Sequence, residues 1–130
     1  MELTSKQVEV SKSADELCDW LSDVKNFESL MPESISKFEV IGDQSFVFAL
    51  KGMPEIGLEV KSVNKPDQVA LGAISDKIPF NLVGDFDRID DNSCKAMLTF
   101  SGDFNPMMSM MIKGPINSFL ETLIGNISKL

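Results

Sequence analysis

The sequence contains no histidine and no tyrosine, and its only arginine is Arg88. Histidine is the side chain that most often moves protons at neutral pH, and tyrosine is another group used for that purpose. A nucleophilic serine or cysteine would also need a neighbouring base. These absences disfavour an enzyme, although an Asp or Glu carboxylate inside a cavity could still do acid–base work.

Positive charge is scarce as well. The 12 Lys and Arg residues are outnumbered by 20 Asp and Glu, which gives a net charge of −8 and a pI near 4.4. Such a chain is a poor partner for nucleic acid or for an anionic membrane surface.

No apolar run approaches the ~20 residues that a membrane helix needs. The N-terminus lacks the basic and apolar regions of a secretory signal, so we expect a cytoplasmic location.

Metal and cofactor motifs are missing too. Cys18 and Cys94 lie far apart, with no CxxC pattern and no histidine to complete a zinc site, so we expect two buried, reduced thiols. The acidic segment 85–91 lacks the glycine and glutamate positions of a calcium loop, and it fits the solvent face of a strand instead. We therefore expect no metal and no cofactor.

The N-terminal third predicts two short helices in tandem. Residues 13–16 read Ser-Ala-Asp-Glu, a capping box that starts a helix, and apolar residues then recur at three- and four-residue spacing. A break is expected near Ser22 and Asp23. The second helix should end before Pro32, because proline disfavours the helical conformation of the preceding residue.

From residue 37 to about 104 the apolar period changes to two, which is typical of antiparallel strands with one apolar face. Six strands are expected there, with an opening strand at about 4–10. Turn-forming sequences separate the six strands, at 42–43, 52–54, 64–67, 76–77 and 90–92.

A long C-terminal helix of about 24 residues is expected after Asn105, which can cap it, and Pro106, which suits its first turn. Gly114 and Pro115 should bend this helix. Its apolar stripe comprises Met108, Met111, Ile112, Ile116, Phe119, Leu120, Leu123 and Ile127. The order predicts a single α+β domain over 1–130, with a seven-stranded antiparallel sheet curved around the helix and room for a ligand between them.

Four segments of this chain resemble the SRPBCC superfamily: 13–17, 21–27, 30–32 and 102–108. These are the START-like or helix-grip proteins, which include lipid-transfer domains, pollen allergens and polyketide cyclases. The chain looks closest to small bacterial single-domain members described as polyketide cyclase or lipid-transport-like. The resemblance implies a helix-grip fold and an internal cavity for hydrophobic ligands. Cyclases of this superfamily rely on polar cavity groups, often histidine, tyrosine or arginine, so the composition counts against cyclase activity.

The leading hypothesis is therefore non-enzymatic binding of a lipid, fatty acid or isoprenoid-like molecule. The expected cavity residues are Phe27, Leu30, Met31, Phe46, Phe48, Leu58, Val60, Leu71, Phe80, Leu82, Leu98, Phe100, Met108, Met111, Ile112 and Phe119. The same residues also fit a plain core. In a second hypothesis the cavity is closed by its own side chains, and Met107 and Met110 contact a protein partner or a second copy. A cyclase-type enzyme is the third.

Overall fold

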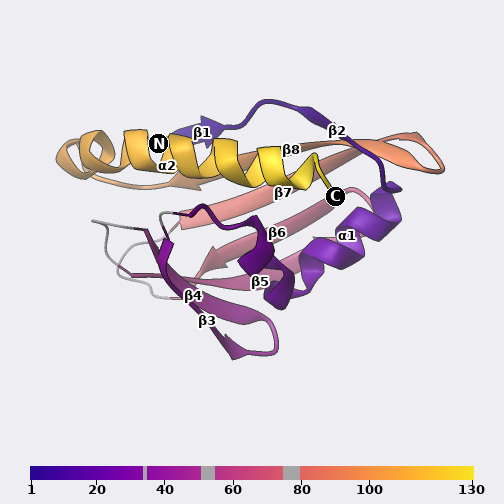
Figure 1. Cartoon of the computed structure of the whole chain (residues 1–130). Helices are drawn as coiled ribbons and strands as arrows, with labels where there is room; N and C mark the ends of the chain where they lie inside the picture. Colours follow the sequence, from indigo (N-terminus) through magenta and orange to yellow (C-terminus); the bar gives the residue numbers. More distant parts are fainter. Residues whose placement is uncertain (34, 51–54, 75–79) are drawn as a thin grey trace.

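The computed structural model describes residues 1–33, 35–50, 55–74 and 80–130 (Figure 1). The expected turns at 52–54 and 76–77 lie outside the described residues. The elements, in chain order, are β1 (Glu2–Thr4), β2 (Val8–Val10), α1 (Ala14–Ser22), the 3-10 helix η1 (Val24–Leu30), β3 (Ile35–Gly42), β4 (Ser45–Leu50), β5 (Ile56–Asn64), β6 (Gln68–Ala73), β7 (Phe80–Asp90), β8 (Ser93–Gly102) and α2 (Pro106–Ile127).

The eight strands in the described residues form one antiparallel sheet in the order β1-β8-β7-β6-β5-β4-β3, and β2 also pairs with β8. The helix α2 lies across one face of this sheet, and α1 and η1 close the end at which α2 finishes (Figure 1). The predicted α+β architecture, a curved sheet gripping a long C-terminal helix, is confirmed.

The opening strand differs from the prediction, because it is split into β1 and β2 at Ser5. The buried Ser5 hydroxyl accepts a hydrogen bond from the Leu98 amide at 2.9 Å and donates one to the Lys6 carbonyl at 2.9 Å. A side-chain oxygen thus takes a place that a backbone carbonyl fills in a regular ladder. The sheet therefore has eight strands where the sequence predicted seven.

The two tandem helices follow the predicted local signals. The Ser13 hydroxyl accepts from the Glu16 amide at 3.1 Å, which starts α1. Asp23 ends α1 and caps η1, because its carboxylate accepts from the Lys25 amide at 3.1 Å. The 3-10 helix η1 finishes at Leu30, before Pro32.

The helix α2 begins where Asn105 caps it, with the Asn105 side chain accepting from the Met108 amide at 2.8 Å. Its 22 residues continue through Pro115, which corresponds to about 33 Å of helix. The fully buried positions begin only at Ile116. Near the other end, the side-chain Nδ2 of Asn126 donates to the Leu30 carbonyl at 2.8 Å and ties α2 to η1. Among the described residues, no helix is long and apolar enough to cross a membrane.

Candidate hydrophobic ligand site

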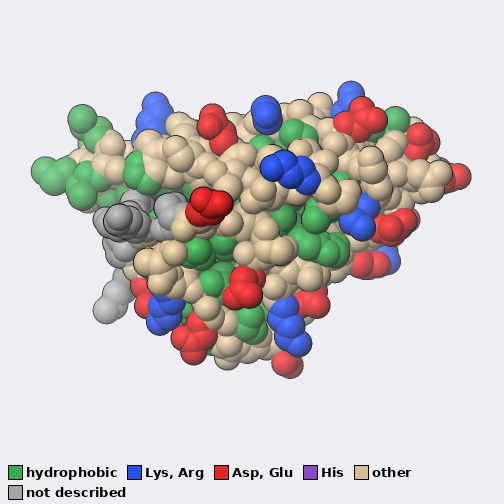
Figure 2. Space-filling view, viewed as in Figure 1, with side chains coloured by type: hydrophobic (Ala, Val, Ile, Leu, Met, Phe, Trp, Pro, Cys, Tyr) green, Lys and Arg blue, Asp and Glu red, His purple; other side chains and the backbone are tan. Residues whose placement is uncertain are grey.

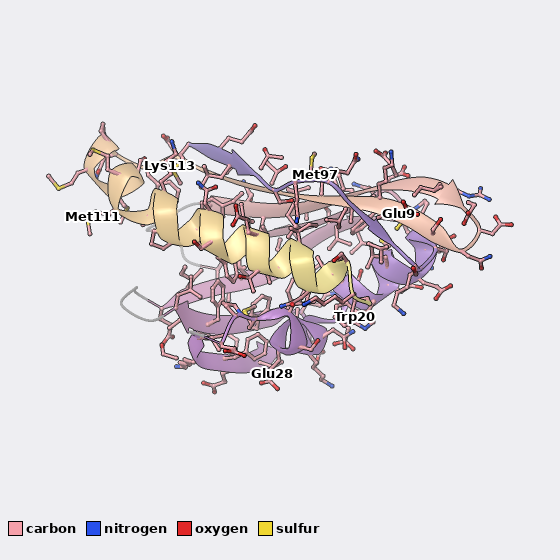
Figure 3. The ribbon with its side chains drawn as sticks, turned by 45° about the horizontal axis from the view of Figure 1, so that its top comes forward. Glu9, Trp20, Glu28, Met97, Met111 and Lys113 are labelled. Carbon is pink, nitrogen blue, oxygen red and sulfur yellow. The ribbon has the colours of Figure 1, made fainter. Side chains whose placement is uncertain are left out.

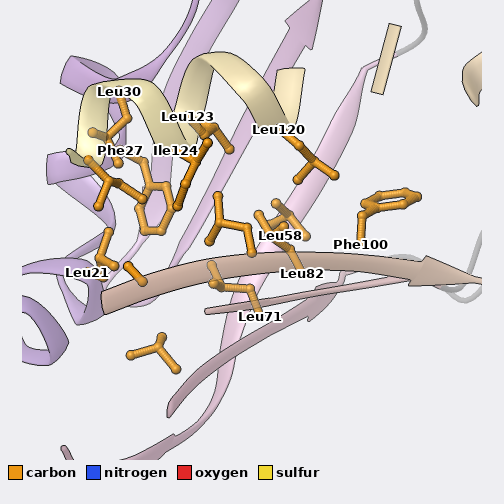
Figure 4. Close-up of a cluster of buried hydrophobic side chains, with 14 of the residues drawn as sticks. Leu21, Phe27, Leu30, Leu58, Leu71, Leu82, Phe100, Leu120, Leu123 and Ile124 are labelled. Atoms are coloured by element: carbon orange, nitrogen blue, oxygen red, sulfur yellow. The ribbon is translucent and has the colours of Figure 1, made fainter. Parts of the chain in front are cut away.

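Most of the predicted cavity residues do meet in one interior, between the sheet and the second half of α2 (Figure 4). None of these side chains is more than 8% exposed. They are Phe27, Leu30, Phe46, Phe48, Leu58, Leu71, Phe80, Leu82, Leu98, Phe100 and Phe119. Met31 and Val60 pack against the same cluster and are half-buried.

Close packing dominates the part of this interior that the described residues enclose, since their side chains are buried against one another. A gap among these side chains has a volume of about 10 Å³ open to a water-sized sphere, and its walls are apolar. A single buried water needs roughly 10–15 Å³ and polar partners. The gap is lined by Leu21, Phe27, Leu30, Val69, Leu71, Leu82, Gly84, Leu98, Leu123 and Ile127. A lipid or an aromatic ligand does not fit there without displacing side chains.

Aromatic rings fill the space that the sequence assigned to a ligand. Phe48 on β4 stacks on Phe119 of α2, with 5.0 Å between ring centroids and 13° between planes. Phe46 lies beside Phe48 at 6.0 Å and beside Phe27 of η1 at 5.2 Å. The rings form a continuous series from η1 through the sheet to the helix, so these phenylalanines act as core.

A second aromatic series lies where β8 leads into α2. Phe80 stacks on Phe100 at 5.5 Å, and Phe100 stacks on Phe104 at 6.1 Å. Gly102 is required for this arrangement, since a Cβ atom at that position would collide with the Phe104 ring. Phe104 is half-buried and was absent from the predicted site. Phe104 belongs to the segment 102–108, which carries the resemblance. No contact between that segment and the buried phenylalanines was predicted.

The first turns of α2 lie beyond this second series and expose three methionines. Met107, Met110 and Met111 are 74%, 83% and 70% exposed, and we call them the methionine patch. Figure 2 shows the hydrophobic side chains that gather at this end of the molecule. Met108 and Ile112 are half-buried, and Ile112 packs against the core.

The expectation that Met111 faces the interior is wrong. Figure 3 places Met111 at the end of the molecule, away from the sheet. Helical spacing puts Met111 on the same stripe as the buried residues, but the first turns of α2 lie near the ends of β7 and β8, with little of the sheet beneath them (Figure 1). A stripe is buried only where a second layer covers it.

The remaining candidate groups are the two cysteines and the acidic side chains. Cys18 and Cys94 are free and buried, as predicted, and burial raises the pKa of both thiols. No cluster of three or more His, Cys, Asp or Glu residues suited to a metal occurs in the ranges 1–33, 35–50, 55–74 and 80–130.

No family model and no curated protein sequence matches the chain. Solved structures do match it. Norcoclaurine synthase from Thalictrum flavum is similar with a TM-score of 0.75 at 18% identity, covering 99% of this chain and 84% of that one. A START superfamily protein from Mycobacterium smegmatis gives a TM-score of 0.69 at 13% identity, with 98% and 97% covered. The chain has the START-like helix-grip fold.

A conserved Geobacillus kaustophilus protein shares the helix-grip fold, with a TM-score of 0.68, 17% identity and coverage of 99% and 93%. One norcoclaurine synthase structure holds dopamine and hydroxybenzaldehyde. At these identities the likeness concerns the fold alone, because one fold carries many functions.

Proposed function

We propose that this helix-grip chain binds a small hydrophobic or amphipathic molecule, without transforming it, at the end formed by the methionine patch and the Phe80–Phe100–Phe104 series. The observation that carries the proposal is the exposure of Met107, Met110 and Met111 beside half-buried apolar side chains. Methionine is flexible and polarisable, so it adapts to ligands of irregular shape. Each Å² of apolar surface removed from water contributes about 25 cal/mol, before ordering costs are subtracted.

The ligand should enter at this end because the first half of α2 is the part that separates from the sheet at least cost. Between Pro106 and Pro115 no residue is fully buried, whereas six residues from Ile116 to Ile127 are. Segments with few buried contacts open locally at low free energy. Entry between β4 and the second half of α2 would instead have to separate Phe48 from Phe119.

A positive charge beside the methionine patch suits a ligand with an anionic head group. Lys113 is the only charged residue between Phe104 and Leu120, and it is exposed on α2 beside the methionine patch. The net charge of the whole chain is −8. A fatty acid could bury its chain against the methionines and leave its carboxylate near the Lys113 ammonium group, a pairing that salt should weaken.

The direct test is a titration with the fluorescent fatty acid cis-parinarate. Met111→Gln keeps the side-chain length and removes apolar contact at the proposed site. A loss equivalent to one methylene, ~0.8 kcal/mol, corresponds to about fourfold weaker binding. The matched control is Ile89→Gln, which changes a 43% exposed residue of β7 at the opposite end. If the two variants bind cis-parinarate with equal affinity, the probe does not bind at the methionine patch.

The small interior gap favours a second candidate, a protein-interaction module whose cavity is closed and whose methionine patch contacts a partner. Native mass spectrometry of the purified protein distinguishes the two. Co-purified lipid mass supports ligand binding, whereas empty protein that also ignores cis-parinarate supports the interaction module. An enzyme ranks third: Ser5 is the only polar residue buried in the described chain, so that part offers no interior carboxylate.

A further inference from the structure

The sequence contains eight methionines, and those that the structure describes differ sharply in exposure. Seven of the eight, all but Met53, lie in the described residues. Met107, Met110 and Met111 are at least 70% exposed, and the other four are only partly exposed. A dissolved oxidant therefore reaches three thioethers far more readily than the rest.

Other oxidisable groups compete poorly with these thioethers. The sequence has no tyrosine and no histidine, and its only tryptophan, Trp20, is half-buried. Cys18 and Cys94 are 0% exposed. Oxidants attack the exposed thiolate form of cysteine, which burial disfavours.

The three thioethers also lie close together on the surface of α2. Met107 is three residues from Met110 and four from Met111, and residues at these spacings are neighbours on one face of a helix. We propose that the methionine patch is a reversible oxidation site for peroxides, and that its oxidation changes this end of the fold from apolar to polar.

The chemistry is an oxygen transfer. With hydrogen peroxide, the methionine sulfur attacks one oxygen, the O–O bond breaks, and the departing hydroxyl takes the proton of the transferred oxygen and leaves as water; an organic hydroperoxide would release an alcohol instead. The sulfur is oxidised to a sulfoxide and the peroxide is reduced. Because Met107, Met110 and Met111 lie outside the core, the sulfoxides alter the surface while the packed interior stays intact. Methionine sulfoxide reductases reverse the change.

Dilute hydrogen peroxide followed by peptide mass mapping tests the site. We expect Met107, Met110 and Met111 to gain oxygen at least fivefold faster than Met31 and Met97. As these three residues gain oxygen, the retention time of the folded protein on a phenyl matrix should shorten. Sulfoxide reductases should restore the original retention time. The inference is overturned if Met31 and Met97 react as fast, or if retention does not change.

A matched variant separates sulfur chemistry from hydrophobicity. Met107→Leu/Met110→Leu/Met111→Leu keeps the end apolar and removes the oxidisable atoms, so peroxide should leave its phenyl retention unchanged. Met97→Leu, the control, should respond to peroxide as the natural chain does. A peroxide response in the triple variant equal to that of the natural chain would also overturn the inference.

The consequence for ligand uptake rests on the proposed function. Oxidation should weaken cis-parinarate binding at least tenfold in the natural chain and leave the triple leucine variant unaffected. If the reduced protein binds no cis-parinarate, the proposed function fails, and the oxidation rates and phenyl retention still decide the oxidation site.

Discussion

Phe48 of β4 and Phe119 of α2 stack with their ring centroids 5.0 Å apart, and this contact joins the strand beside the β3 edge of the sheet directly to the long helix. Both rings are almost fully buried, at 1% and 3% exposure. The pair fills part of the space between sheet and helix with packed core. A ligand site is therefore displaced toward the first turns of α2, where the apolar side chains are uncovered.

Replacing Phe119 with alanine should reduce the free energy of unfolding by about 3–5 kcal/mol, because it removes a buried ring and leaves a cavity against Phe48. Urea unfolding followed by circular dichroism measures this loss. Phe119→Leu, which leaves a smaller cavity, should cost less. The alanine variant should also bind benzene, since an apolar cavity of sufficient size stays dry. A loss below 1 kcal/mol would contradict the role of this ring in the core.

Ser5→Ala should lower the free energy of unfolding by about 1–3 kcal/mol, because the Leu98 amide loses its buried acceptor. Amide exchange at Leu98 should accelerate at the same time. The control is Ser118→Ala, an exposed helix position whose replacement should change stability by less than about 0.5 kcal/mol. Similar effects in the two variants would show that the Ser5 hydroxyl is not a structural partner of β8.

The sequence predicted best those features that depend on neighbours along the chain. The capping residues Ser13, Asp23 and Asn105 act within three positions of themselves, so the starts of α1, η1 and α2 could be predicted from local chemistry. The splitting of the opening strand could not. It depends on the Ser5 hydroxyl meeting the amide of Leu98, 93 residues away.

The candidate site was predicted less well than the fold, for a geometric reason. Alternation and helical spacing place Phe48 and Phe119 on inward faces, but they do not give the distance between those faces. Whether two facing rings touch or enclose a cavity depends on the curvature of the sheet. Met111 was misplaced for a related reason, because spacing does not say how far a helix extends past the sheet that covers it.

The hydrogen bonds to the Asp90 carboxylate predict a contribution to folding stability that depends on pH in the acid range. Its carboxylate accepts hydrogen bonds from the Asn92 amide at 2.8 Å and the Ser93 hydroxyl at 2.9 Å, and these hold the pKa of Asp90 below its usual value. Since the folded pKa is the lower one, this contribution to stability is present above the unfolded pKa of about 3.9 and is lost as pH falls through the folded pKa.

The measurement is a carboxyl-carbon NMR titration of Asp90. Ser93→Ala should raise the pKa of Asp90 toward its usual value, because one of the hydrogen bonds to the charged form is removed. Ser93→Thr keeps a hydroxyl at this position and should preserve the low pKa. A titration midpoint unchanged in the alanine variant would assign the shift to the Asn92 amide alone.

The two halves of α2 should exchange their amide hydrogens at different rates. Residues 108–113 lie in the part of the helix with no fully buried side chain, whereas 119–124 include four buried residues. Pro115 has no N–H group, so the Met111 carbonyl lacks its ladder partner four residues on. Exchange should be faster in 108–113, and cis-parinarate should slow that segment preferentially if it binds there.

Pro115→Ala is the matched variant for this experiment. It supplies an N–H group to the Met111 carbonyl, so exchange in 108–113 should slow, while exchange in 119–124 stays the same. If the two segments are equally protected in the natural chain, and ligand changes neither, the first half of α2 does not open independently. The fatty acid would then have to reach the interior by another route, and the proposed site at the methionine patch would lose its means of entry.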